Sequence, residues 1–200
     1  SPIYGWPIYG EANAILPMEA GNMNYFLLHS DPRYVDSPEF LDWRGKIDPR
    51  NIRPGTSHKI ARRQILNIRP NPHTVFVDVI SSPFLLLSKK CMEVVTLYEP
   101  QVISKQIILL DMETPQRETY YLPILKQIHC LAEGSEWNLD KSVLSKGVIN
   151  LEPVGDTSIF QLADMKNIYT VIRIDILESM LKRGARGVGI TPLETVKGEN

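Results

Sequence analysis

From residue 74 onward, apolar positions fall in short runs and in helical spacing, which predicts strands that alternate with helices. The runs Thr74–Val77 and Phe84–Leu87 have the length of buried strands. In the next segment, apolar residues recur with the spacing of one helix face, which predicts a helix over about Lys89–Tyr98. Its buried side is expected to consist of Cys91, Val94, Val95 and Tyr98.

Two longer segments rich in strand-forming residues predict an antiparallel hairpin. Val102–Leu110 and Thr119–Leu131 are separated by the polar stretch Glu113–Arg117, which is typical of a turn. The polar segment Glu133–Gly147 is expected to be a loop. Shorter strands are predicted at Val148–Leu151 and Ser158–Leu162.

The last third of the chain repeats the strand–helix–strand pattern. An apolar run at Ile168–Ile172 precedes a helix predicted over about Asp175–Arg183 and an extended segment at Val188–Ile190. Gly184 directly follows the basic end of this helix, so it is expected to adopt the left-handed conformation that closes helices. When Ser88 is placed on Arg173, the apolar positions of the two helices coincide. Either an internal repeat or the common pattern of amphipathic helices would produce this match.

These elements together predict an α+β (mixed α/β) fold, since hairpin signals and strand–helix–strand signals occur in one chain. The long hairpin is expected at the centre of a sheet, flanked by two similar strand–helix–strand units. Both helices are expected to cover one face of that sheet.

The first 73 residues have a different character from the rest. Residues 1–23 are rich in proline and glycine with aromatic residues between them, and they are expected to pack onto the domain as an arm. A strand is predicted at Tyr25–Leu28 and a short helix at Ser37–Trp43, where serine and proline occupy the first positions. We therefore divide the chain into an N-terminal part, 1–73, and an α+β core, 74–200, within one compact domain overall.

The segment from Arg44 to Arg69 carries eight basic residues and one acidic residue, Asp48. Its periodicity is weak and it contains several prolines, so it is expected to be a long irregular connector, a class of segment that is often functional. The candidate partner-binding residues are Trp43, Arg44, Arg50, Arg53, Arg62 and Arg63. Alternatively, these arginines pair with acidic residues of the second half. No Phe, Tyr or Trp lies between Arg44 and Arg69, which argues against base stacking and RNA binding.

Composition restricts the function classes further. The 200 residues suit one globular domain, with 43% hydrophobic and 22% charged residues. A net charge of −1 argues against a nucleic-acid partner for the whole domain. No apolar stretch is long enough for a membrane helix and no signal peptide is visible, so a cytoplasmic protein without a membrane partner is expected. The two cysteines, Cys91 and Cys130, are expected to be buried reduced thiols.

No arrangement of catalytic, metal-ligating or cofactor-binding residues is recognisable. The four histidines lie outside any zinc-binding spacing, and no serine sits in a nucleophile elbow. The glycines from Gly184 to Gly189 follow a helix, whereas a nucleotide-binding loop follows a strand. No catalytic residue, metal or cofactor is therefore expected. The alternatives are an enzyme that uses His129 or His58 within a pocket, and a regulatory interaction module.

The order and spacing of several segments resemble a bacterial immunity-protein family of polymorphic toxin systems, of the type first described in a myxobacterial immunity protein. These segments include Phe84–Val95, Tyr120–Ile124, Gly134–Glu136, Ile159–Leu162, Ile172–Glu178 and Arg186–Val188. The resemblance covers roughly residues 74–192, and Arg173 departs from it because family members commonly have serine there. It implies a cytoplasmic antidote that binds a cognate toxin domain, and it assigns no catalytic residues and no interface.

Overall fold

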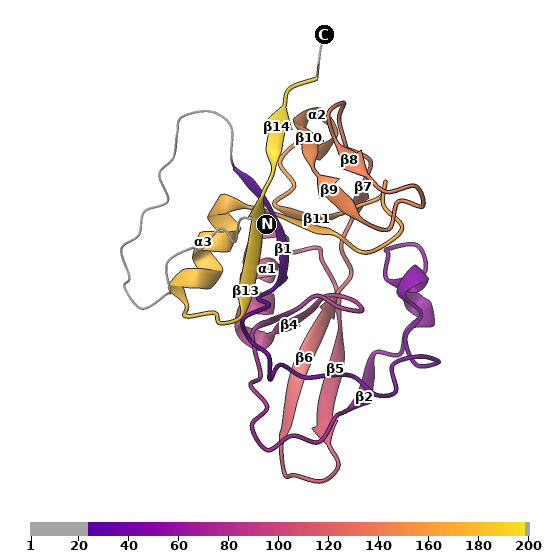
Figure 1. Ribbon diagram of the computed structural model, residues 1–200, viewed down its shortest axis with the longest axis vertical. Coiled ribbons are helices and arrows are strands. Elements are labelled where there is room, and N and C mark those ends of the chain that lie inside the picture. Colours follow the sequence, from indigo (N-terminus) through magenta and orange to yellow (C-terminus); the bar gives the residue numbers. More distant parts are fainter. Residues whose placement is uncertain (1–23, 199–200) are drawn as a thin grey trace.

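The computed structural model describes residues 24–198, which form an α+β fold built on two five-stranded sheets (Figure 1). The arm predicted at 1–23 lies outside the described residues. Sheet A has the order β13-β1-β12-β11-β7, formed by Val188–Pro192, Tyr25–Ser30, Thr170–Arg173, Ile159–Leu162 and Gln127–Ile128. Sheet B has the order β2-β5-β6-β4-β3, formed by Arg63–Ile68, Ser104–Asp111, Arg117–Pro123, Leu86–Ser88 and Val79–Ile80.

The remaining elements are short, apart from two helices. Strands β10 and β14 form a parallel pair, and β8 and β9 form an antiparallel pair, with bounds Val148–Asn150, Glu194–Val196, Glu136–Trp137 and Leu144–Lys146. The α-helices of the described chain are α1, α2 and α3, with bounds Lys89–Tyr98, Leu151–Val154 and Ile174–Lys182. Two 3-10 turns, η1 and η2, cover Pro49–Asn51 and Ser57–Lys59.

The two predicted strand–helix–strand units are present, and they share one topology. In sheet B, β4 leads through α1 to β5, and β6 lies antiparallel between the two strands. In sheet A, β12 leads through α3 to β13, and β1 lies antiparallel between them. Each unit also carries the strand that precedes it, β3 or β11, on its outer side. The hairpin β5–β6 is at the centre of sheet B as expected, but the chain builds two sheets where one was predicted.

Helices α1 and α3 lie against each other in opposite directions, joined at both ends. The Tyr98 hydroxyl of α1 donates to the Asp175 carbonyl, and Lys90 donates to the Gly184 carbonyl just after α3. Their buried residues form one core with both sheets, through Phe26 and Ile172 of sheet A and Leu87 of sheet B. The helices therefore join the two sheets.

Two further cores lie on the opposite faces of the sheets. One is enclosed between sheet A and the β10–β14 region and includes Phe160, Val171 and Ile149. The other lies on sheet B, where Leu66, Ile107 and Tyr120 are covered by the segment that leads into β2. In Figure 1, sheet B occupies the lower half of the molecule and the β8–β10 region the upper half.

Several local predictions are wrong. The loop expected at Glu133–Gly147 contains the paired strands β8 and β9, and Tyr98, expected on the buried side of its helix, is exposed. Ser37–Trp43 is not helical, because this segment follows the edge of β2: the Leu41 amide donates to the Asn67 carbonyl and Asp42 accepts from the Asn67 amide. Thr74–Val77 joins no sheet, and the strand begins later, at Val79. Conversely, β2 lies inside the connector that was expected to be irregular.

Candidate functional site

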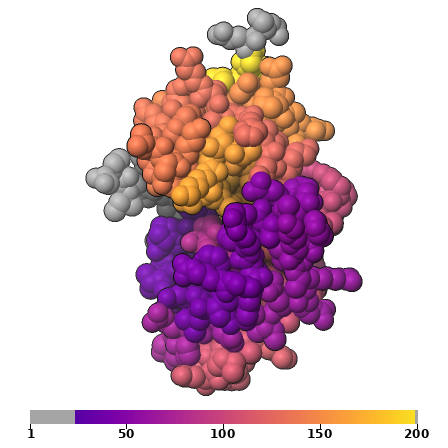
Figure 2. All heavy atoms as spheres, turned by 90° about the vertical axis from the view of Figure 1, so that its right-hand side faces the viewer, coloured from indigo at the N-terminus to yellow at the C-terminus, as the bar shows by residue number. Residues whose placement is uncertain are grey.

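The basic connector is a strap held firmly against sheet B. We use the name strap for residues 44–62, which precede β2. Ile47, Ile52 and Ile60 are 1–3% exposed and pack into the core of sheet B, while the arginines between them are exposed. Figure 2 shows this part of the chain, in indigo and purple, spread over the lower half of one face. The strap therefore presents its positive charges from fixed positions.

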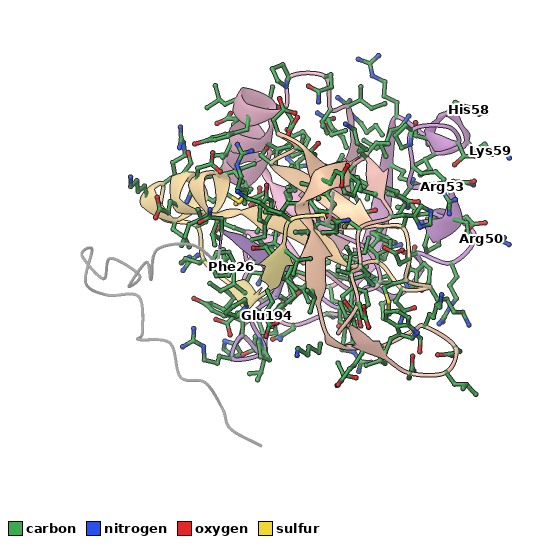
Figure 3. The ribbon with its side chains drawn as sticks, turned by 90° about the horizontal axis from the view of Figure 1, so that it is seen from above. Phe26, Arg50, Arg53, His58, Lys59 and Glu194 are labelled. Carbon is green, nitrogen blue, oxygen red and sulfur yellow. The ribbon has the colours of Figure 1, made fainter. Side chains whose placement is uncertain are left out.

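The two 3-10 turns display most of these charges. At η1, the Asp48 side chain accepts from the Arg50 backbone amide and also binds the Arg50 guanidinium through its Nε, at 3.1 Å. These hydrogen bonds lower the pKa of Asp48. Figure 3 shows Arg50 and Arg53 near η1, with His58 and Lys59 on η2, together at one rim of the molecule.

Local acids neutralise only part of the strap and its flanks. Ion pairs join basic residues to acids close to them in the chain or across the β2 edge, namely Lys46–Asp42, Arg50–Asp48 and Arg69–Glu39. Within residues 24–198, no acid of the second half pairs with the strap, so that alternative is wrong for the described chain. Arg53, Lys59 and Arg62 form no ion pair within the same range. They leave an excess of exposed positive charge.

Trp43 and Arg44 begin the strap with a stacked pair. The Arg44 guanidinium lies 4.9 Å from the centroid of the Trp43 ring. The same ring meets Phe84 edge to face, at 5.9 Å between centroids. Because Phe84 is completely buried, Trp43 is fixed by the core and holds Arg44 at the surface.

Arg62 and Arg63 are separated from the other predicted site residues by their place on the sheet. Strand β2 directs Leu66 and Ile68 toward the strap core, so Arg63, at the alternate position, belongs to the other face. There, Arg63 lies opposite Gln106 of β5, which lies opposite Tyr121 of β6. The six predicted residues therefore form two groups: Trp43, Arg44, Arg50 and Arg53 in the first part of this region, and Arg62 and Arg63 where the strap ends and β2 begins.

An open pocket of about 540 Å³ occupies this second location, lined by Arg62, Arg63, Ser104, Gln106 and Tyr121. It lies on the same face of sheet B as α1, which packs against β4 and β6. Arg63 Nε donates to Gln106 Oε1 at 2.7 Å, which fixes both side chains. Arg62 makes no side-chain hydrogen bond or ion pair with residues 24–198. The pocket is lined by hydrogen-bond donors and contains no carboxylate among these residues.

The histidines named for an alternative enzyme lie apart from this pocket. His58 is exposed on η2. His129 is also exposed, and its Nδ1 lies 3.2 Å from Asp164 Oδ1. Asp164 also accepts the backbone amide of the neighbouring Cys130. Burial raises the pKa of the Cys130 thiol to about 12, which keeps it protonated and unreactive at neutral pH.

The other cysteine is buried in the same way, and the described residues form no metal-binding cluster. Cys91 is buried and free, and burial raises its pKa to about 12. Across residues 24–198, no cluster of three or more His, Cys, Asp or Glu side chains could hold a metal ion. In the same range, no helix is both long and apolar enough to cross a membrane.

The sequence indicated the arginines of the pocket but not Ser104, Gln106 and Tyr121. Alternation along β5 places Ser104 and Gln106 on one face of that strand. These residues lie beside Arg63, however, only because β2 and β5 pair in parallel, and β2 was not predicted as a strand.

Among known proteins, no protein-family model matches the chain and no curated protein matches it.

Proposed function

We propose that this protein is a non-enzymatic cytoplasmic immunity protein that binds a cognate bacterial toxin domain through the basic surface of the strap. The observation that carries the proposal is a set of exposed cations, Arg53, Lys59 and Arg62, without acidic partners in residues 24–198, on a segment fixed by three buried isoleucines. The segments that resemble the immunity-protein family support the same function.

A fixed positive surface suits fast and selective association with an acidic protein. Complementary charges increase the rate of encounter, by tenfold or more at low salt. A surface that is ordered before binding also loses less conformational entropy when the complex forms. The stacked Trp43–Arg44 pair supplies the residue types that dominate binding energy in many interfaces.

The enzyme alternative receives less support from the described residues. His129 has an acidic neighbour, but the adjacent thiol is buried, with its pKa raised to about 12. His58 is exposed on the strap and does not line the pocket described above. A general base needs a reacting group within hydrogen-bond reach, and among residues 24–198 neither histidine forms a hydrogen bond with a hydroxyl or thiol.

The test of the proposal is protection of cells. The protein is co-expressed with toxin domains encoded beside its gene, and growth is expected to be restored. The purified pair is then expected to form a complex without turnover of any substrate. Failure to protect against every neighbouring toxin would remove the immunity function.

The role of the strap is tested separately by association kinetics. Replacing Arg50 and Arg53 with Glu is expected to slow association by about tenfold at low salt and to flatten its salt dependence. The control replaces Lys182 and Arg183 with Glu, which makes the same charge change at the end of α3. Equal slowing by both variants would show that net charge, rather than the strap, governs the encounter.

A further inference from the structure

We infer that the pocket at the start of β2 binds the phosphate group of a small phosphate ester. This inference does not depend on the protein-binding function proposed above, although Arg62, at the end of the strap, belongs to both surfaces. It is lined by Arg62, Arg63, Ser104, Gln106 and Tyr121. Arg62, Arg63 and Gln106 supply N–H donors to this lining, and Ser104 and Tyr121 add hydroxyl groups.

The hydrogen bonds within the site leave most of these donors available. Arg63 uses its Nε to bind Gln106 Oε1, so its terminal nitrogens remain for a ligand. The same bond uses the only acceptor of the Gln106 amide and thereby orients its NH₂ group as a donor. Arg62 retains its full set of donors with respect to residues 24–198. An oxyanion with three peripheral oxygens can accept from such a set, because arginine binds phosphate with two parallel hydrogen bonds.

Among the described residues, the strand positions on this face of the sheet carry no carboxylate, and the nearby Asp42 is bound by Asn67 and Lys46. The strand positions that share the face with Arg63 can be read from the pairing register. They are Arg63, Ile65 and Asn67 on β2, Ser104, Gln106, Ile108 and Leu110 on β5, and Arg117, Thr119 and Tyr121 on β6. None of these residues is acidic, so the two arginines create a local positive potential that an anion would neutralise.

The size of the pocket indicates a ligand larger than inorganic phosphate. Its volume of about 540 Å³ lies in the range of sites for small organic molecules. Phosphate would occupy only the part beside the arginines. Tyr121 is half-buried and rests against the core of α1 and α3, so it provides a fixed aromatic wall for the organic group. A phosphate monoester with a compact ring system, such as a nucleoside monophosphate, matches these features.

The site is tested by calorimetric titration of the full chain with AMP, inorganic phosphate and adenosine. AMP is expected to bind most tightly, phosphate more weakly and adenosine weakest. Replacing both Arg62 and Arg63 with Gln is expected to weaken AMP binding by at least about tenfold, because charge-assisted hydrogen bonds are lost. The matched control, Arg50→Gln with Arg53→Gln, removes the same charge from the strap and is expected to bind AMP like the native chain.

Three results would overturn the inference. One is no binding of AMP or phosphate at millimolar concentration by a chain with a native thermal melt. Another is equal weakening by the two double variants, which would mean that overall charge attracts the anion. The third is binding of a glutamate-rich peptide without binding of either phosphate compound, which would assign the pocket to a protein partner. The variant Arg62→Lys with Arg63→Lys separates charge from geometry: it is expected to bind AMP more weakly than the native chain, and native affinity would contradict paired arginine contacts.

Discussion

The two strand–helix–strand units of this protein share a topology but are held in place by different means. In β4–α1–β5, both ends of the helix are fixed by buried acidic residues that contact segments far away in the chain. In β12–α3–β13, the acidic residue at the start of the helix is partly exposed and pairs with its neighbour Arg173, and the contacts with distant segments use backbone carbonyls. The comparison shows that one backbone arrangement can be held by buried carboxylates in one unit and without them in the other.

The long-range contacts of α1 involve Asp78 and Glu99. Asp78, which is 8% exposed, accepts the Ser88 hydroxyl at 2.6 Å and the Arg186 amide at 2.6 Å. Ser88 in turn caps α1 by accepting the Cys91 amide. At the other end, Glu99 is 9% exposed and accepts both the amide and the hydroxyl of Ser158, at 2.7 and 2.8 Å.

The side chains at the two ends of α3 are held differently, and the Arg173 guanidinium also donates to the carbonyl of Asp156. Arg173, at the start of the helix, has no side-chain capping bond and instead pairs with Asp175 at 2.8 Å. The Arg173 guanidinium lowers the pKa of Asp175. After the helix, Gly184 adopts φ +78°, the left-handed conformation predicted from its position.

The largest difference between the units is expected from Asp78→Ala. The substitution leaves the Ser88 hydroxyl and the Arg186 amide without their acceptor, in a place from which water is largely excluded. We expect it to lower the free energy of unfolding by about 3 kcal/mol, since hydrogen bonds to a charged group are involved. Denaturant unfolding measures this value. Asp78→Asn keeps one acceptor oxygen and should lose clearly less; an equal loss would mean that packing, not hydrogen bonding, is responsible.

The contact at the end of α1 is expected to depend on pH. Burial alone would raise the pKa of Glu99, but hydrogen bonds from Ser158 and Gln101 outweigh it and lower the pKa. The contribution of Glu99 is therefore complete above its ordinary pKa of 4.5 and is lost as the pH falls through the lowered value of the folded state. At pH 7, Glu99→Ala should cost about 2 kcal/mol.

Unfolding experiments at a series of pH values test this linkage. The stability difference between native protein and Glu99→Ala is expected to shrink as the pH falls below 4.5. Glu93→Ala is the control on the same helix, because Glu93 is 64% exposed and faces Lys89 only at 3.9 Å. Its effect should stay within about 0.5 kcal/mol. A Glu99 difference that is constant with pH would contradict a role for its charge.

The local end of α3 is tested by Gly184→Val. A Cβ at this position would meet no atom within 4 Å, so the expected cost comes from the positive φ alone. A β-branched residue in this conformation should lower stability by about 1–2 kcal/mol. Gly184→Asn should cost less, because asparagine tolerates the left-handed region. Equal losses for the two variants in thermal melts would show that backbone conformation is not the cause.

The difference between local and long-range contacts also explains what could be predicted from the sequence. The bounds of α1 and the glycine after α3 follow from capping residues and apolar spacing within a few positions. The roles of Asp78 and Glu99 depend on partners at Arg186 and Ser158, which no local pattern reveals. For the same reason, the helix predicted at 37–43 yields to contacts with the edge of β2.

The candidate site could also be predicted only in part, because some of its features depend on contacts between distant segments. The sequence indicated the excess of positive charge and the arginines that carry it. It did not indicate that Ile47, Ile52 and Ile60 bury one side of the strap, because these residues lack the spacing of a helix or strand. The pocket was also missed, since it depends on the register that brings Arg63 beside Gln106.

The smallest expected effects concern the capping residue that precedes each helix, Ser88 for α1 and Arg173 for α3. Ser88→Ala removes the cap of α1 and one partner of Asp78, and it should cost about 1 kcal/mol or slightly more. Arg173→Ala removes a partly exposed ion pair and the hydrogen bond to the Asp156 carbonyl, and it should cost about 1 kcal/mol or less.

Arg173→Ser tests whether a serine can cap α3 as Ser88 caps α1. The backbone at Arg173, with φ −80° and ψ 151°, already has the extended conformation of a capping residue. A serine there should gain a capping bond while losing the pair with Asp175, so the net change in stability should lie within about 0.5 kcal/mol of zero. Denaturant unfolding of Ser88→Ala, Arg173→Ala and Arg173→Ser under one condition gives the comparison. A loss for Arg173→Ser larger than that for Ser88→Ala would show that the Arg173–Asp175 pair holds α3 as firmly as the buried serine holds α1.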